Sequence, residues 1–123
     1  MGTAAHSFSF EKTDRLLTSQ DFKFVFDYAL RSTDNCFTVL ARPNQLEHAR
    51  LGMALSKKML KRAVDRNRMK RLVREQFRIH QDNLPAVDIV VLARQGLVSK
   101  GNTEIRDSLQ QHWLKLRQLC AKS

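Results

Sequence analysis

The segment from Lys57 to Arg78 constrains this chain most, because it combines a helical apolar stripe with a large excess of positive charge. It holds ten cations and two acids, Asp65 and Glu75, and so carries eight of the ten net charges. At roughly 100° per residue, the apolar side holds Met69, Leu72, Val73 and Phe77, and the cationic side holds Asn67, Lys70, Arg71, Arg74 and Arg78. We therefore expect a helix from about residue 58 to residue 80 that buries one side and offers the other to a partner.

The partner indicated by this cationic side is a nucleic acid. A solvated helix normally mixes opposite charges at i, i+4, but this side has no acid within it. Glu75 can pair locally with Arg71 or Arg78, at i−4 and i+3. Arginine suits bidentate recognition of phosphate and stacking on bases. The net charge of the chain is +10, and its positive side chains repel one another unless a polyanion neutralises them. For Asn67, an RNA contact and a local structural hydrogen bond remain equally open.

A second amphipathic helix is expected over about residues 19–30. A capping box at residues 18–21 marks its start. Apolar residues at helical spacing then follow, namely Phe22, Val25, Phe26 and Ala29. Two roles stay open for Phe22 and Phe26, since aromatic side chains at i and i+4 usually belong to a core but also form stacking surfaces.

Three apolar segments are expected to form a small mixed sheet. Residues 36–41 and 50–55 predict strands joined by a polar turn, which permits a hairpin, and residues 87–93 are a nearly continuous apolar run typical of a buried strand. The basic helix lies between the last two and implies a crossover. A final helix, capped at Asn102 or Thr103, has an apolar face of Ile105, Leu109, Trp113, Leu116 and Cys120. The fold class is therefore α+β, a single domain with a small mixed sheet covered by helices.

Size and composition exclude several other classes. The 123 residues suit one RNA-binding domain, expected over residues 15–120, after a flexible segment over residues 1–14. No apolar run approaches the roughly 20 residues of a membrane span, and a secretion signal is not indicated, so a cytoplasmic location is expected. Cys36 and Cys120 are far apart and the four histidines are scattered, which indicates neither a zinc site nor a disulfide. The basic helix has no cluster of carboxylates for Mg²⁺ beside it, so cleavage of RNA by the protein alone is not expected.

Three motifs resemble, in the same order, the protein family of bacterial ribonuclease P, the tRNA 5′-maturation ribonucleoprotein. The run Arg66–Arg78 is similar to the R-N-R helix of that family, Arg50–Lys58 to the strand that leads into it, and Asp21–Phe26 to its first helix. The resemblance covers about residues 15–118. It implies an α-β sandwich with a left-handed crossover between parallel strands, where general physical rules predict a right-handed one.

The resemblance also implies roles for individual residues. The basic helix is expected to dock on the catalytic RNA subunit through Arg66, Asn67, Arg68, Lys70, Arg71, Arg74 and Arg78. A cleft for the single-stranded 5′ leader of precursor tRNA is expected to include Phe22, Phe26, Leu40, Lys57 and Lys58. Leu40 stands where some family members carry a Tyr, so a stacking surface worth ~1–3 kcal/mol per base is missing there. Arg50 is expected to contact RNA at a point that the resemblance does not specify.

The implied function is that of a protein component of the ribonuclease P endoribonuclease, which removes the leader to give mature tRNA 5′ ends. The RNA subunit is expected to hold the catalytic centre and its Mg²⁺ ions, and the protein to have no catalytic or metal-ligating residue, organic cofactor or obligate protein partner. A ribosome-associated or other structured-RNA-binding protein with no processing role is the main alternative. A DNA-binding protein, which lacks support from a short-turn two-helix unit, and an autonomous nuclease are the others.

Overall fold

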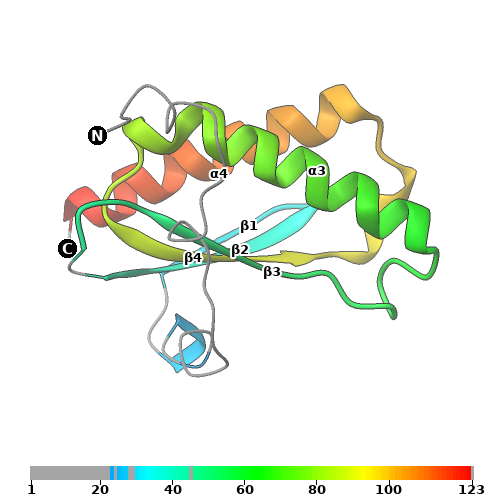
Figure 1. Cartoon of the computed structure of the whole chain (residues 1–123), viewed down its shortest axis with the longest axis horizontal. Coiled ribbons are helices and arrows are strands. Elements are labelled where there is room, and N and C mark those ends of the chain that lie inside the picture. The colour runs from blue at the N-terminus through cyan, green and yellow to red at the C-terminus, as the bar shows by residue number, and fades with distance from the viewer. Residues whose placement is uncertain (1–22, 24, 28–29, 45, 123) are drawn as a thin grey trace, which may run out of the picture.

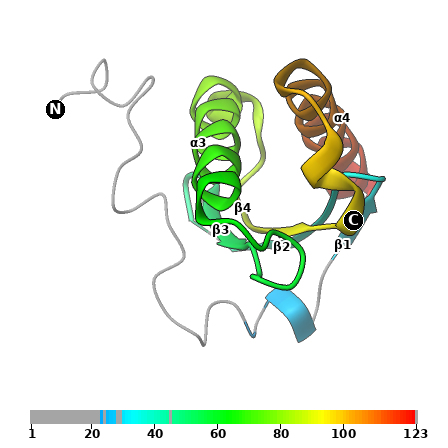
Figure 2. The same ribbon diagram turned by 90° about the vertical axis from the view of Figure 1, so that its right-hand side faces the viewer.

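The computed structural model describes residues 23, 25–27, 30–44 and 46–122, and has the predicted α+β class. Residues 23 and 25–27 are helical. The other elements are, in chain order, β1 (Leu30–Thr33), β2 (Phe37–Pro43), β3 (Arg50–Ala54), α3 (Ala63–His80), the 3-10 turn η2 (Gln81–Asn83), β4 (Val87–Ala93), the 3-10 turn η3 (Gln95–Ser99) and α4 (Asn102–Lys122). Helices α3 and α4 lie side by side on one face of the sheet, and residues 25–27 lie on the side of its other face (Figure 1, Figure 2).

The sheet has the strand order β1-β2-β4-β3. Strand β4 is antiparallel to β2 and parallel to β3, so α3 makes the predicted crossover between parallel strands. Its left-handed sense stays a prediction from the resemblance. The hairpin considered for residues 36–41 and 50–55 is wrong, because β4 lies between β2 and β3. A nearly continuous apolar strand is most favourable in the centre of a sheet, where helices or other residues cover both faces.

Strand β1 and three element boundaries differ from the predictions. Strand β1 has only four residues, and it begins at Leu30, where a helix was expected to end. Helix α3 begins at Ala63, not near residue 58, because the buried Leu60 belongs to a turn and Arg62 is extended, with φ −89° and ψ 135°. Helix α4 is capped one residue before the predicted position, since the carbonyl of Gly101 accepts the Ile105 N–H at 3.0 Å.

The apolar core fills the space between the sheet and the two helices. Both predicted apolar faces are confirmed. Helix α3 buries Met69, Leu72, Val73 and Phe77, and α4 buries Ile105, Leu109, Trp113 and Leu116, with Cys120 partly buried. Phe77 meets Trp113 edge to face, with 6.4 Å between ring centroids, and joins the helices. Cys36 and Cys120 are free, and burial raises the pKa of both thiols, which favours the protonated form.

Candidate nucleic-acid interface

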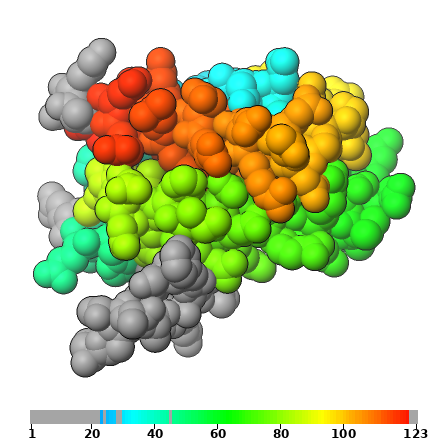
Figure 3. All heavy atoms as spheres, turned by 90° about the horizontal axis from the view of Figure 1, so that it is seen from above, coloured from blue at the N-terminus to red at the C-terminus, as the bar shows by residue number. Residues whose placement is uncertain are grey.

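The outward side of α3 is a cationic stripe made of Asn67, Lys70, Arg71, Arg74 and Arg78. Asn67 and Arg71 are exposed, and the other three are partly buried, as expected for long side chains lying along a helix. Figure 3 shows α3 beside α4 on this surface of the molecule. Because every charged member of the stripe is positive, the stripe is the strongest candidate for contact with a polyanion.

The two acids of α3 do not neutralise the stripe. Asp65 Oδ2 lies 3.7 Å from Arg62 Nε, before the helix. Glu75 accepts a hydrogen bond from Arg106 Nε at 3.2 Å, so the predicted local pairing of Glu75 with Arg71 or Arg78 is wrong. The helical turn places Glu75 on the side of α3 that faces α4, where Arg106 is within reach. Both acids of α3 therefore pair with arginines outside the stripe.

Arg66 and Arg68 flank the stripe and turn back into the protein. On a helix they lie roughly 100° to either side of the outward Asn67. Arg66 Nη1 donates to the carbonyl oxygens of Leu60 at 2.7 Å and Lys61 at 3.1 Å. Arg68 Nη1 donates to Asn102 Oδ1 at 2.6 Å, at the start of α4. The structure therefore separates the two arginines of the R-N-R motif from the outward stripe, although all seven residues were predicted together.

The residues expected at the leader cleft are distributed over two parts of the molecule. Lys57 and Lys58 are exposed on the turn after β3. That turn and the helical residues 25–27 lie at different positions along the long axis (Figure 1). Phe22 lies outside the described residues. A leader that contacts both Phe26 and the lysines would therefore need to run extended along the molecule.

The second face of the sheet carries a small apolar cluster. Val25, Leu40 and Val90 are buried together, with Leu92 packed against them. Leu40 is only 3% exposed, so it packs inside this cluster and presents little surface to a ligand. Phe26 is 49% exposed, which removes the core interpretation for this residue and leaves its ring available to a partner.

Arg50 has a partner within the protein. Its Nε and Nη2 donate to the two carboxylate oxygens of Asp88 at 2.7 and 2.6 Å, and Asn44 Nδ2 donates to Asp88 Oδ1 at 3.0 Å. This bidentate pair joins β3 to β4 and holds the connection after β2. RNA contact by Arg50 stays a prediction. The sequence reasoning missed Asp88, although an acid inside an otherwise apolar strand is a recognisable signal of a paired charge.

Replacing Asp88 with alanine is expected to lower the free energy of unfolding by about 2–3 kcal/mol, below the 3–5 kcal/mol for fully buried pairs because this pair is partly solvated. The loss arises because Arg50 keeps its charge but loses the carboxylate that accepts two of its hydrogen bonds. Urea unfolding measures the change. The matched control is Asp107→Ala, since Asp107 is an exposed acid on α4. Equal stability of the two variants would contradict the structural role of the pair.

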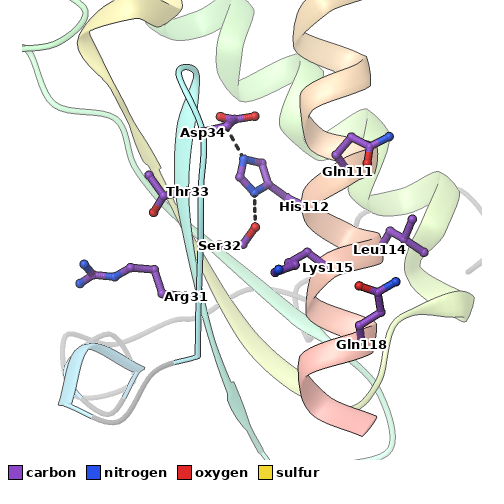
Figure 4. A pocket seen from close by; sticks show the side chains of 9 residues that line it. All are labelled: Arg31, Ser32, Thr33, Asp34, Gln111, His112, Leu114, Lys115 and Gln118. Atoms are coloured by element: carbon purple, nitrogen blue, oxygen red, sulfur yellow. Dashed lines mark hydrogen bonds and ion pairs between the residues drawn. The ribbon is translucent and has the colours of Figure 1, made fainter. Parts of the chain in front are cut away.

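Ser32 on β1 and Asp34 on the β1–β2 turn face His112 on α4 (Figure 4). Ser108 Oγ completes this polar cluster by donating to Asp34 Oδ2 at 2.6 Å. Ser32 Oγ is 2.7 Å from His112 Nδ1, and His112 Nε2 is 3.1 Å from Asp34 Oδ1, without hydrogen-bond alignment. Burial raises the pKa of Asp34, but hydrogen bonds from Ser108 and from the Phe37 and Cys36 amides outweigh it and lower that pKa overall. His112 is 2% exposed. The cluster thus links β1 and the β1–β2 turn to α4.

Metal-binding and membrane-spanning features can be assessed for the part of the chain that the structure describes. Within it, His, Cys, Asp and Glu side chains form no group of three or more that could hold a metal ion. No helix among these residues is long and apolar enough to cross a membrane.

Comparison with known proteins identifies close relatives. A family model described as Ribonuclease P matches residues 10–117. The ribonuclease P protein component of Methylococcus capsulatus is 48% identical over 116 residues, with 94% of this chain and 91% of the relative covered. That of Legionella pneumophila (strain Corby) is 54% identical over 109 residues, with 89% and 94% covered.

Comparison with solved structures also gives matches to RNase P proteins. A Staphylococcus aureus RNase P protein mutant with defective mRNA degradation activity matches with a TM-score of 0.81 and 36% identity, covering 88% of this chain and 91% of that one. The Thermotoga maritima RNase P protein in complex with 1-(4-fluorophenyl)-2-thiourea matches with a TM-score of 0.75 and 33% identity, covering 80% and 96%. The observed fold is therefore the fold of these proteins.

Proposed function

Because the chain belongs to the bacterial ribonuclease P protein component family, we propose that its α3 stripe docks on the catalytic RNA subunit and that the second face of its sheet receives the 5′ leader of precursor tRNA. The chain is a subunit of the ribonuclease P endoribonuclease holoenzyme, and as such associates with the ribonuclease P RNA. The proposal concerns which surfaces meet which RNA. A cytoplasmic location is part of it, since bacterial precursor tRNA is made there.

The observation that carries the docking proposal is the concentration of four cations and no acid in the stripe. Its four cations lie on one side of one helix, while Asp65 and Glu75 pair with arginines outside the stripe. Dense cations on a rigid helix match the regular spacing of phosphates, and their contacts release counterions from the RNA. The guanidinium groups of Arg71 and Arg74 add bidentate geometry, which suits phosphate better than a diffuse positive surface does.

The leader proposal is supported by the second face of the sheet. Phe26 is a half-exposed aromatic that follows Val25, which is buried with Leu40 and Val90, and an exposed ring of this kind suits stacking of an unpaired base. Lys57 and Lys58 offer positive charge farther along the molecule, within reach of an extended strand. Single-stranded RNA is commonly bound by this combination of an aromatic platform and cations that follow the backbone.

Catalysis is assigned in this proposal to the RNA subunit. Among the described residues, the basic helix has no cluster of carboxylates beside it, and no chemical step is assigned to the protein in this proposal. We propose that the Mg²⁺ ions of the reaction are held mainly by the RNA. The protein then contributes binding, because its cations lower the phosphate repulsion between the leader and the RNA subunit.

The test is 5′ cleavage of a precursor tRNA at low Mg²⁺ with the protein alone, the cognate RNA subunit alone, and both together. We expect rapid cleavage only in the mixture, because the protein's cations replace part of the screening that Mg²⁺ otherwise gives. An unstimulated mixture would leave only a basic RNA-binding domain. Degradation by the protein alone would instead favour direct RNA degradation, the activity named for the S. aureus mutant.

A further inference from the structure

The turn between β3 and α3, residues 56–62, concentrates exposed cations outside the α3 stripe. Lys57, Lys58, Lys61 and Arg62 are all exposed, whereas Leu60 between them is fully buried in the main core. Four positive charges within six residues repel one another, and an unfixed loop would spread them apart. The conformation of this turn must therefore be held by contacts other than those of its own charged side chains.

Those contacts come from both ends of the turn. At its start, the Ser56 carbonyl accepts the Met59 and Leu60 N–H groups at 3.2 and 2.9 Å. At its end, Arg66 Nη1 donates to the Leu60 and Lys61 carbonyls at 2.7 and 3.1 Å. Backbone carbonyls in an exposed turn are otherwise left to water, so a charged donor shared by two of them fixes the local chain direction.

We infer that Arg66 is a positioning residue, which holds the turn 56–62 so that Lys57, Lys58 and Lys61 contact an RNA backbone. The inference rests on the proposed function, since it assumes that the protein binds RNA through its cationic surfaces. It differs from the expectation that Arg66 itself docks on RNA. The Arg66 side chain lies at the flank of α3 and its Nη1 is directed at the turn, whereas the stripe projects outward.

A double-mutant cycle separates positioning from direct contact. Arg66→Ala is made in the natural chain and in a triple-alanine background, Lys57→Ala with Lys58→Ala and Lys61→Ala. For each variant, the affinity of the full-length protein for the RNA subunit is measured. The affinity of the holoenzyme for precursor and for mature tRNA is measured as well. In the natural background we expect Arg66→Ala to weaken RNA binding about tenfold, the scale of one charge-assisted hydrogen bond. In the triple-alanine background it should change affinity less than about twofold, because the groups that it positions are gone.

The salt dependence of RNA affinity distinguishes a positioning role of Arg66 from a direct phosphate contact. The triple-alanine background should have a smaller slope of log affinity against log salt, and adding Arg66→Ala should leave that slope unchanged. A further fall of roughly 0.7–0.9, the value of one lost phosphate contact, would overturn the inference. So would an equal loss of affinity from Arg66→Ala in both backgrounds, or natural affinity in the triple-alanine variant. A loss for the RNA subunit, or one confined to tRNA with a leader, supports it and identifies the backbone contacted.

Arg66→Lys covers the case in which Arg66→Ala does not fold. Lysine keeps the charge but cannot reach two carbonyls with a planar fork. Positioning predicts weaker RNA binding by Arg66→Lys and faster amide exchange at Met59 and Leu60, and natural affinity would overturn it. Arg71→Ala is the matched control, since Arg71 is exposed on the stripe. It should weaken RNA binding additively in both backgrounds, and its failure to do so would count against the proposed function, not against the role of Arg66.

Discussion

Replacing Arg71 and Arg74 together by alanine is expected to weaken binding of the RNA subunit by on the order of 100-fold at low salt, as two lost phosphate contacts predict. Both residues belong to the outward stripe, and the two acids of α3 pair with Arg62 and Arg106. Each lost contact should also reduce the slope of log affinity against log salt by roughly 0.9 on a duplex. Equilibrium binding to the RNA subunit at several salt concentrations measures both quantities.

The control for this pair is Lys115→Ala with Arg117→Ala, which removes the same charge from exposed positions on α4. If the stripe is a docking surface, the control should change affinity only a few-fold, through the general field of the protein. Equal losses in the two double variants would mean that net charge, and not the position of the stripe, governs binding. An unchanged salt slope in the α3 variant would exclude phosphate contacts by these arginines.

The helices could be predicted because their apolar faces repeat along the chain. Met69, Val73 and Phe77 on α3 and Leu109 and Trp113 on α4 are buried as the helical period requires. Strand β4 was likewise predicted at its correct bounds, since a short apolar run between turn residues is typical of a buried strand.

The pairing of strands could not be predicted, because periodicity describes which face of a strand is buried and not which strand lies beside it. Strands β2 and β3 are neighbours in sequence, yet β4 separates them, and only the complete sheet decides that order. Strand β1 has four residues with Arg31 and Thr33 exposed, too short a pattern to distinguish from a loop.

The candidate site could be predicted as a surface but not residue by residue. A helical projection correctly places Asn67 and Arg71 outward, and it places Arg66 and Arg68 at the edges of the same side. Whether an edge arginine meets RNA or the protein depends on which loops lie beside the helix. Here Arg66 meets the Leu60 carbonyl and Arg68 meets the Asn102 side chain. The helical pattern of α3 does not indicate either contact.

The 5′ leader should depend on Phe26 if the second face of the sheet is its binding surface. Phe26→Ala is expected to weaken binding of precursor tRNA to the holoenzyme by roughly 5- to 150-fold, the range of ~1–3 kcal/mol for one base stacked on an aromatic ring. Binding of mature tRNA, which has no leader, should change little. Because Phe26 is already 49% exposed, its removal should cost about 1 kcal/mol of folding stability or less.

Two comparisons separate stacking from a general loss of apolar surface. Phe26→Tyr keeps the ring and should retain most of the affinity for precursor tRNA, whereas Phe26→Leu should lose it, since only an aromatic face stacks on a base. Leu114→Ala is the control for exposure, because Leu114 is 47% exposed on α4. Equal weakening of precursor and mature tRNA binding by Phe26→Ala would place its role in RNA-subunit docking. Full affinity in Phe26→Leu would show that the surface is apolar packing and not a stacking platform.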